Sequence, residues 1–281
     1  MKIVESFDDL QKALGELKKP VGFVPTMGFL HDGHLSLVKK AKEDCESVVV
    51  SIFANPAQFA EDEDLDNYPQ DIDRDLNLLI SVDTDLVWIP TVKSMYPEDF
   101  QTWVNVEKVS IPLEGEFRPT HFRGVTTVVS KLFNAVHPDR AFFGQKDAQQ
   151  AVVIKQMTRD LNYPIKIIIC PIIREPDGLA MSSRNIYLND QERQAALCLS
   201  RGLLAAKDSF QAGERDAEKL RHTVKNVIKK ESLAELQYIS CANPETLEEL
   251  DGNVETSLLS MAVFIGRTRL IDNVLLGKSK P

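Results

Sequence analysis

Short β-branched stretches alternate with amphipathic stretches through the first two-thirds of the chain. Some of the apolar stretches, such as Ser47–Phe53, are apolar along most of their length, which is typical of parallel strands buried on both faces. The pattern predicts strands at Val21–Val24, Ser47–Phe53, Leu86–Ile89, Arg140–Gly144 and Ile165–Ile169, with a short β-like segment at Trp103–Val106. It predicts helices at Leu35–Cys45, Asp71–Ser81, Gly124–Val136 and Ala148–Leu161. This β-α-β order predicts a doubly wound parallel sheet, with ligands at the carboxyl ends of its strands.

The pattern changes after the turn-rich stretch Arg174–Gly178. Two long amphipathic helices, Asp190–Ala212 and Asp216–Glu231, are followed by short strands at Gln237–Cys241, Leu258–Phe264 and Arg269–Leu276, the last two spaced to pair as a hairpin. We therefore expect a Rossmann-like α/β domain over residues 1–175. A smaller α+β domain over residues 176–281 would act as a lid or wall.

Composition and charge narrow the class of protein. The chain has 281 residues, a formal net charge of −9 and no apolar run near the roughly 18 residues needed to span a membrane. Its N-terminus lacks the apolar core of a signal peptide, so we expect a cytoplasmic protein. The acidic balance argues against a nucleic-acid partner but not against a small anionic substrate. The acidic run 61–64 is interpreted as a solvated loop.

Several familiar sites are missing from the sequence. The four cysteines are far apart and form no Cys-x-x-Cys pair, so a zinc or redox site is not expected and no metal ligand is assigned. No Ser-His-Asp arrangement, Walker-type loop or Gly-x-Gly-x-x-Gly is present, which disfavours covalent catalysis, a P-loop and a dinucleotide site.

The most informative motif is His31-Asp32-Gly33-His34, where a predicted strand meets a predicted helix. The first turn of a helix carries unpaired N–H donors and the positive end of the helix dipole, so it is suited to phosphate. His31 and His34 are three residues apart and can both reach one phosphate group, while Gly28 allows the preceding turn and Gly33 lets the backbone approach closely. The plainer alternative is that the two histidines only cap the helix.

Two further groups of residues suit a nucleotide. In Gly144-Gln145-Lys146-Asp147, after another apolar strand, Lys146 supplies a point charge for phosphate and Asp147 can accept from a ribose hydroxyl or cap a helix. In Met181-Ser182-Ser183-Arg184, two hydroxyls, a guanidinium and backbone N–H groups form a set that can grip phosphate. Alone, a Ser-Ser-Arg sequence is usually a helix cap or an exposed loop.

Amide side chains follow two of the predicted strands. Gln58 comes after Ser47–Phe53, and Gln149 and Gln150 lie on the first turn of the helix after Asp147. An amide both donates and accepts, which suits a substrate with hydroxyl and carboxylate groups, although a loop amide bonded to the backbone is as plausible. His121, before the Gly124–Val136 helix, is interpreted as structural rather than catalytic.

These residues together resemble the pantothenate synthetase (pantoate–β-alanine ligase) family of the His-x-Gly-His nucleotidyltransferases. The resemblance spans nearly the whole chain and rests on blocks in the family's order and spacing: Pro25–Gly28, His31–His34, Asn55–Phe59, Tyr68–Pro69, His121–Val125, Gly144–Asp147 with Gln149–Gln150, Arg174–Glu175, Met181–Arg184 and Leu270–Asn273. Two positions depart from the family's pattern: Gln145 stands where an acidic residue or Lys is common, and Thr120 stands where Gly is usual.

The resemblance implies ATP-dependent condensation of pantoate with β-alanine, through a pantoyl adenylate and with release of pyrophosphate and AMP. It implies Mg²⁺ with the ATP and a homodimer. It implies four catalytic groups: His34, His31, Lys146 and Arg184. The implied ATP-binding residues are Met27, Gly28, His31, Gly33, His34, Gly144, Gln145, Lys146, Asp147, Ile173 (at adenine), Met181, Ser182, Ser183 and Arg184. Gln58 and Gln150 would bind pantoate, with Gln58 also near β-alanine.

Three rival functions remain open. The first is another adenylyl- or cytidylyltransferase with a different acceptor, distinguished by the glutamine pair Gln58 and Gln150. The second is a non-catalytic nucleotide-binding protein with the same fold, which the intact histidines and cations disfavour. The third, a tRNA-charging enzyme, is disfavoured by the acidic net charge.

Overall fold

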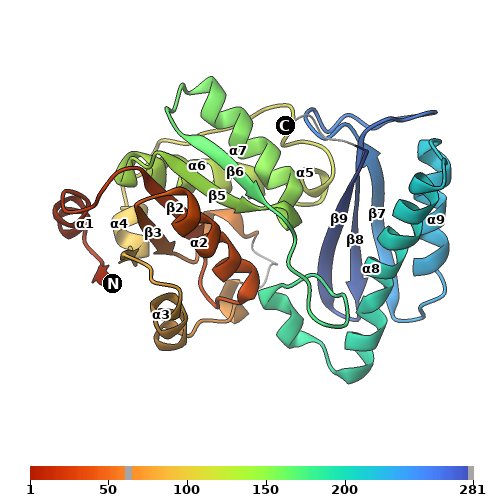
Figure 1. Cartoon of the computed structure of the whole chain (residues 1–281), viewed down its shortest axis with the longest axis horizontal. Helices are drawn as coiled ribbons and strands as arrows, with labels where there is room; N and C mark the ends of the chain where they lie inside the picture. Colours follow the sequence, from red (N-terminus) through yellow and green to blue (C-terminus); the bar gives the residue numbers. More distant parts are fainter. Residues whose placement is uncertain (61–64, 278–281) are drawn as a thin grey trace. The chain divides into compact units, whose positions relative to one another are not determined.

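The computed structural model describes residues 1–60 and 65–277, and these form two compact units. One unit comprises Met1–Gln145 with Val153–Pro171, and the other comprises Lys146–Val152 with Ile172–Pro281. The first contains a six-stranded sheet of order β1-β4-β3-β2-β5-β6, and the second a three-stranded sheet of order β7-β8-β9 (Figure 1). The assignment of a nucleotide site to one domain and a lid to the other stays a prediction.

All pairings in the six-stranded sheet are parallel, which confirms the predicted fold class. Its strands are β1 (Lys2–Val4), β2 (Val21–Thr26), β3 (Ser47–Ile52), β4 (Leu86–Trp88), β5 (Arg140–Gly144) and β6 (Lys166–Cys170). The longer helices are α1 (Phe7–Leu14), α2 (Asp32–Asp44), α3 (Ile72–Ser81), α6 (His121–Val136) and α7 (Ala148–Asp160). The one-turn elements are η1 (Pro56–Gln58), η2 (Leu65–Asn67), α4 (Val92–Met95), α5 (Glu114–Phe117) and η3 (Gln145–Asp147).

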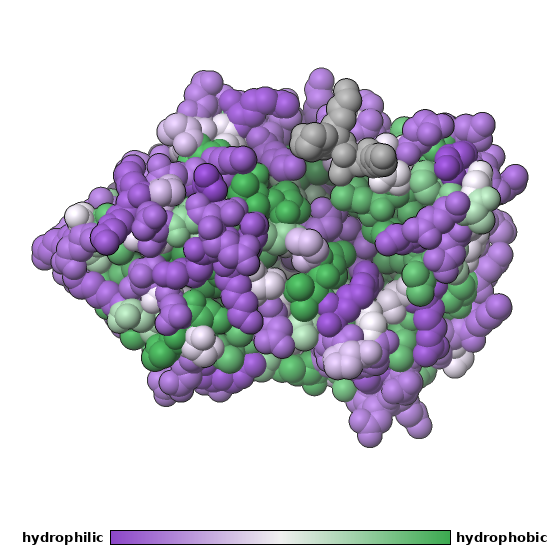
Figure 2. Space-filling view, in the orientation of Figure 1, coloured by the Kyte–Doolittle hydropathy of each residue, from purple (hydrophilic) through white to green (hydrophobic). Residues whose placement is uncertain are grey.

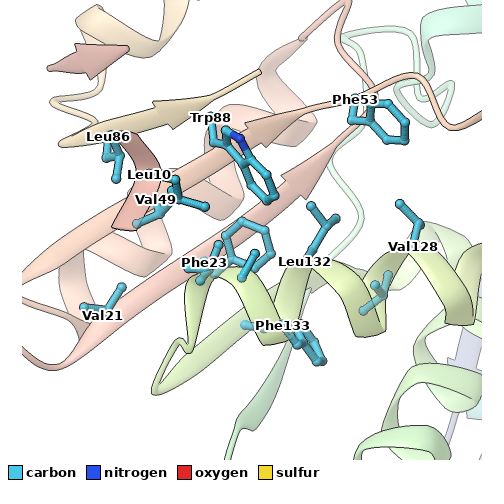
Figure 3. Packing of buried hydrophobic residues seen from close by; sticks show 14 of the residues in the cluster. Leu10, Val21, Phe23, Val49, Phe53, Leu86, Trp88, Val128, Leu132 and Phe133 are labelled. Carbon is cyan, nitrogen blue, oxygen red and sulfur yellow. The ribbon is translucent and has the colours of Figure 1, made fainter. Parts of the chain in front are cut away.

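Successive residues of the central strands face opposite sides of the sheet, and each side has its own core. Phe23 and Val49 pack with Leu10 of α1 and Phe133 of α6 on one face (Figure 3). Val24, the next residue of β2, belongs to the opposite core, which is covered by α2 and α3. The apolar runs of these strands are thus explained by burial on both faces.

The two halves of the sheet are wound in opposite directions from β2. The chain passes from β2 to β3 and β4 on one side, whereas β5 pairs with the other side of β2 and β6 lies beyond it. A sheet of this kind has a crevice at the carboxyl ends of the two strands where the direction changes. The residues that follow Thr26 and Gly144 therefore open onto that crevice.

The predicted strands and helices of this unit are confirmed, except for Trp103–Val106, which is not a strand. The backbone N–H of Val104 donates to Thr127 Oγ1 at 3.0 Å, and its carbonyl accepts from Thr126 Oγ1 at 2.6 Å. Hydroxyls of α6 therefore take the place of a neighbouring strand. β1 and α1 were not predicted, and the acidic run 61–64 lies outside the described residues.

The C-terminal unit packs helices against its antiparallel sheet, as the sequence pattern predicts. Its elements are η4 (Ser183–Tyr187), α8 (Asp190–Gln211), α9 (Ala217–Ile228), β7 (Ala234–Ala242), β8 (Ser257–Ile265) and β9 (Thr268–Leu276). β8 and β9 form the expected hairpin, closed at Ile265 and Thr268. The core between sheet and helices includes Leu199, Leu220 and Met261.

Hydrophilic residues cover most of the face shown in Figure 2, with apolar residues visible between them. Over residues 1–60 and 65–277, no helix has both the length and the apolar character needed to cross a membrane.

Candidate active site

The turn between β2 and α2 is a tight loop that glycine makes possible. Gly28 has φ +87° and Phe29 has φ 50°, so two consecutive residues adopt left-handed backbone. A Cβ at Gly28 would lie 3.2 Å from both Asp75 Oδ2 and Ile52 Cγ2. Conformation and space therefore both favour glycine, and the predicted role of Gly28 in the turn is confirmed. Gly33, by contrast, lies in the first turn of α2.

Asp75 of α3 holds this turn in place. Its side chain is fully buried, and its two oxygens accept the backbone N–H groups of Phe29 and Leu30, each at 2.7 Å. Burial raises the pKa of Asp75, and the two N–H donors oppose that shift. This residue was not predicted from the sequence. An aspartate at a buried position of an otherwise amphipathic helix was the available signal.

His31 and His34 begin α2 and lie against each other. His31 is the N-cap residue, and the imidazole of His34, at position N3, accepts the backbone N–H of His31 at its Nδ1 atom at 3.3 Å. The ring centroids are 4.1 Å apart. The capping interpretation is therefore correct for His34 Nδ1. Because Nδ1 accepts, the neutral ring carries its proton on Nε2, so the acceptor and the donor of His34 lie on opposite sides of the ring.

Gln58 is buried in a side-chain network at the end of β3. Its Nε2 atom donates to the sulfur of Met27 at 2.9 Å, and its Oε1 atom accepts from Asn55 Nδ2 at 3.1 Å. Asn55 Oδ1 in turn accepts a hydrogen bond from the hydroxyl of Tyr96 at 2.8 Å. Burial raises the pKa of Tyr96, so this hydroxyl remains a donor. A thioether is a weak acceptor, so the Gln58 N–H group can exchange Met27 for a better partner at small cost.

The backbone of Gln58 is fixed by the start of α6. His121 Nδ1 lies 2.9 Å from the carbonyl oxygen of Gln58, which gives His121 the structural role that the sequence favoured. At Gly124, a Cβ atom would lie 2.1 Å from the carbonyl oxygen of Ala57. Only glycine allows α6 to approach the η1 turn this closely.

A small cavity lies beside the turn between β2 and α2. It has a volume of about 180 Å³ and opens among the carboxyl ends of β2, β3 and β4. Met27, Gly28 and Asp75 contribute to its lining, together with the apolar residues Ile52, Phe53, Ile89 and Pro90. The cavity therefore borders the turn that carries the histidines.

In the C-terminal unit, Lys146 and Asp147 follow β5 in the chain and pair with each other. Lys146 Nζ lies 3.5 Å from Asp147 Oδ1, with Asp147 about half exposed. A partly exposed ion pair of this kind contributes little free energy, so the ammonium can exchange it for a phosphate. Gln150 lies half-buried in the first turn of α7.

The Ser-Ser-Arg segment follows a small hairpin. The N–H of Met181 donates to the carbonyl of Ile173 at 3.0 Å, which brings the two ends of the hairpin together. Ser182 Oγ accepts the N–H of Arg184 at 3.3 Å and so caps η4, the plainer interpretation that the sequence allowed. Ile173, Met181 and Arg184 are half-buried, while Ser183 is buried.

The predicted site residues thus form one set in each unit. The first unit contains Met27, Gly28, His31, Gly33, His34 and Gln58, together with Gly144 at the end of β5 and Gln145 directly after it. The second holds Lys146, Asp147, Gln150, Ile173, Met181, Ser182, Ser183 and Arg184. Within the described part of the chain, no cluster of three or more His, Cys, Asp or Glu side chains is arranged to hold a metal ion.

Fold and site define a doubly wound α/β protein with a histidine-bearing turn at the crevice of its sheet. A family model described as pantoate-beta-alanine ligase matches residues 2–275. The chain belongs to the pantoate–β-alanine ligase family, a family of enzymes that form a C–N bond.

Relatives cover the chain nearly end to end. The chain is 52% identical over 276 residues to a pantothenate synthetase of Roseiflexus castenholzii, covering 98% of this chain and 99% of that one. A crystal structure of pantothenate synthetase from Thermus thermophilus matches with a TM-score of 0.93 and 41% identity, over 98% and 99% of the two chains. A Francisella tularensis pantoate-beta-alanine ligase, complexed with beta-gamma ATP and beta-alanine, matches with a TM-score of 0.82 and 36% identity, over 98% and 97%.

Proposed function

We propose that this protein condenses pantoate with β-alanine at the expense of ATP. The observation that carries the proposal is the family match over residues 2–275, together with relatives of the same length. The Francisella relative is complexed with an ATP compound and β-alanine. The same two substrates, with pantoate, are proposed for this chain.

The proposed reaction has two steps. A carboxylate oxygen of pantoate attacks the α-phosphorus of ATP, the bond to the β-phosphate oxygen breaks, and pyrophosphate leaves. The amine of β-alanine then attacks the acyl carbon of the pantoyl adenylate, the bond to AMP breaks, and the amine loses a proton. The pantoate carboxylate is ionised at neutral pH, so the first step needs no base. It needs positioning and neutralisation of phosphate charge.

The proposed roles of the N-terminal set follow from its geometry. The Nε2–H group of His34 donates to the phosphates as charge develops, because Nδ1 is held by the backbone of His31. His31 contacts the same phosphates, and Met27, Gly28 and Gly33 line the approach of ATP. Gln58 exchanges its Met27 contact for pantoate and lies near β-alanine.

The C-terminal set supplies most of the cations. We propose that Lys146 and Arg184 neutralise phosphate charge, with Met181, Ser182 and Ser183 at the phosphates and Ile173 at adenine. Gly144, Gln145 and Asp147 would contact ribose and phosphate, and Gln150 would bind pantoate. Mg²⁺ prefers phosphate oxygens and water, so it would enter with ATP and be held chiefly by the nucleotide.

The direct test follows AMP release from ATP, pantoate and β-alanine by the purified protein. Pyrophosphate exchange into ATP should require pantoate, and replacing pantoate with an unrelated hydroxy acid is the control. Equal exchange with the unrelated acid would assign the chain to another acyl-adenylate former. Gln58→Leu should raise the KM for pantoate about tenfold or more, the expected loss when a polar substrate group is left unpaired. The exposed Gln101→Leu is the matched control.

The remaining proposals concern the setting of the enzyme. A homodimer is proposed on the resemblance to the family, and light scattering of the purified protein tests it. A cytoplasmic location is proposed because all four cysteines are free thiols, as is usual in a reducing compartment, and fractionation of cells that express the protein tests it.

A further inference from the structure

Asp272 and Asn273 are adjacent residues of β9 whose polar side chains are almost fully buried. Their exposed fractions are 2% and 3%, although β9 is an edge strand of its sheet. Successive strand residues point to opposite faces, so the pair places one polar group on each face. Burying a carboxylate or an amide costs free energy unless it is hydrogen-bonded, so the partners indicate what the pair does.

Asp272 holds the base of the hairpin that leads to Ser182. Its two oxygens accept hydrogen bonds from the two terminal nitrogens of Arg174, at 2.7 and 3.0 Å, in a bidentate pair. Arg174 Nη1 also donates to the carbonyl of Gly178 at 3.2 Å, across the hairpin. Arg174 directly follows Ile173 and pairs with Ala180 in an isolated bridge, one residue before Met181. Through Arg174, the carboxylate of Asp272 is linked to the first strand of this hairpin and to its turn.

Asn273 holds a second segment that is distant in the sequence. Its Nδ2 atom donates to the backbone carbonyl of Lys146 at 2.9 Å, 127 residues away. The backbone N–H of Asn273 donates to Asp272 Oδ1 at 2.8 Å, so the carboxylate that binds Arg174 is also bonded to the backbone of Asn273. One dipeptide therefore contacts the segment that carries Lys146 and the segment that leads to Arg184. All of these residues belong to the C-terminal unit.

The geometry points to Asp272 and Asn273 as a positioning pair that sets, from a single strand, the two segments that hold the ATP phosphates. Asn273 acts through the backbone of Lys146, and Asp272 acts through Arg174 and the 173–181 hairpin. The inference rests on the proposed function, since it assigns Lys146 and Arg184 to the triphosphate. Beyond that function, it assigns Asp272 and Asn273 to aligning the two cationic side chains before ATP binds. This lowers the entropic cost of ordering the side chains on binding.

The test is a double-mutant cycle on binding of a non-hydrolysable ATP analogue, measured by calorimetry. Asn273→Ala should weaken analogue binding about tenfold when Lys146 is present, and less than twofold in the Lys146→Ala background. Equal weakening in both backgrounds, or no weakening, would overturn the role of Asn273. Ser257→Ala is the control. It removes a buried polar group from the neighbouring strand β8 and should leave analogue binding unchanged.

Asp272 is tested through its partner. Asp272→Asn and Arg174→Lys each destroy the bidentate pair while keeping size or charge, so each should raise the KM for ATP several-fold and the double variant no further. Additive effects would overturn the pairing role. Chemical unfolding of every variant separates misfolding from misplacement, because a purely structural role lowers stability without changing the KM of the folded enzyme. If the wild-type protein releases no AMP, the proposed function fails, whereas the analogue-binding cycle still decides the positioning role.

Discussion

The backbone N–H of His31 donates to Nδ1 of His34, so one histidine of the motif orients the ring of the other. The same bond that caps α2 fixes which nitrogen of His34 carries the proton in the neutral ring. Capping and phosphate binding are therefore not alternatives at this position. In the proposed function, capping uses the Nδ1 edge of this imidazole and phosphate binding uses the Nε2 edge.

This relationship predicts that the two roles can be separated by substitution. Glutamine is a good capping residue at N3 because it can accept the N-cap N–H, so His34→Gln should change the free energy of unfolding by less than about 1 kcal/mol. It removes the imidazole donor, and turnover should fall about 100- to 1000-fold. His34→Ala should lose a similar amount of activity and also the cap. Denaturant unfolding and AMP release measure the two quantities, and full turnover in His34→Gln would show that another group stabilises the phosphates.

Much of the fold could be predicted because the signals were local. The run at β3 is apolar over enough residues to identify a buried parallel strand, and the turn at Gly28 needed a residue that tolerates positive φ. The segment at Trp103–Val106 has a strand-like composition, but its backbone is satisfied by two threonine hydroxyls from a helix. That pairing depends on tertiary contacts, which the local pattern does not contain.

The supporting residues of the site were harder to predict for the same reason. Asp75 lies 45 residues from Leu30 in sequence, and its place on the apolar side of its helix does not show which backbone groups it binds. Asn273 reaches Lys146 across 127 residues. The sequence identified groups suited to contact substrate, since their chemistry is visible in their type. Groups that act by holding the backbone became visible only with the fold.

Asp75 should be essential for the shape of the β2–α2 turn. Asp75→Asn keeps the volume but turns one acceptor into a donor that faces a backbone N–H group. We expect a loss of about 1–3 kcal/mol in the free energy of unfolding, the usual cost of an unsatisfied buried group. The KM for ATP should also rise, since the turn carries both histidines. Asp73→Asn, on the exposed side of the same helix, should be neutral in both measurements, and equal behaviour of the two variants would contradict this role.

Gly124 should tolerate no side chain. A Cβ there would approach the Ala57 carbonyl oxygen to 2.1 Å, and a backbone atom cannot move aside as a side chain can. Gly124→Ala should therefore destabilise the protein by about 1–3 kcal/mol, in the range of overpacked cores, and displace Gln58. The expected kinetic result is a raised KM for pantoate. Gly15→Ala is the control, because Gly15 has ordinary right-handed helical backbone. A Cβ atom there would lie 3.4 Å from its nearest neighbour, the carbonyl oxygen of Lys12. Thermal unfolding measures the two stabilities. Equal changes in Tm for Gly124→Ala and Gly15→Ala would contradict the close approach of α6 to the Ala57 carbonyl.

The hairpin that precedes Ser182 is also held by a cluster of charges, which makes the stability of the C-terminal unit depend on pH. Arg193 of α8 donates to Glu175 at 2.7 Å and to Asp177 at 2.7 Å. The hydrogen bond from Arg193 lowers the pKa of Glu175 below its ordinary value of 4.5, and burial opposes this shift only in part. A carboxylate with a lowered pKa in the folded state stabilises the protein above pH 4.5, and this contribution is lost as the pH falls through the folded-state value.

Glu175→Gln should therefore be less stable than wild type at pH 7, by about 1 kcal/mol for a charge-assisted hydrogen bond. The difference should shrink as the pH falls from about 4.5 toward the lower folded-state pKa of Glu175, because the unfolded wild-type chain takes up the proton first. Urea unfolding at pH 7, 5 and 3.5 gives the comparison, with Glu235→Gln at an exposed position of β7 as the control. A difference that stays constant across this pH range would mean that shape, not charge, is what Glu175 contributes to the hairpin.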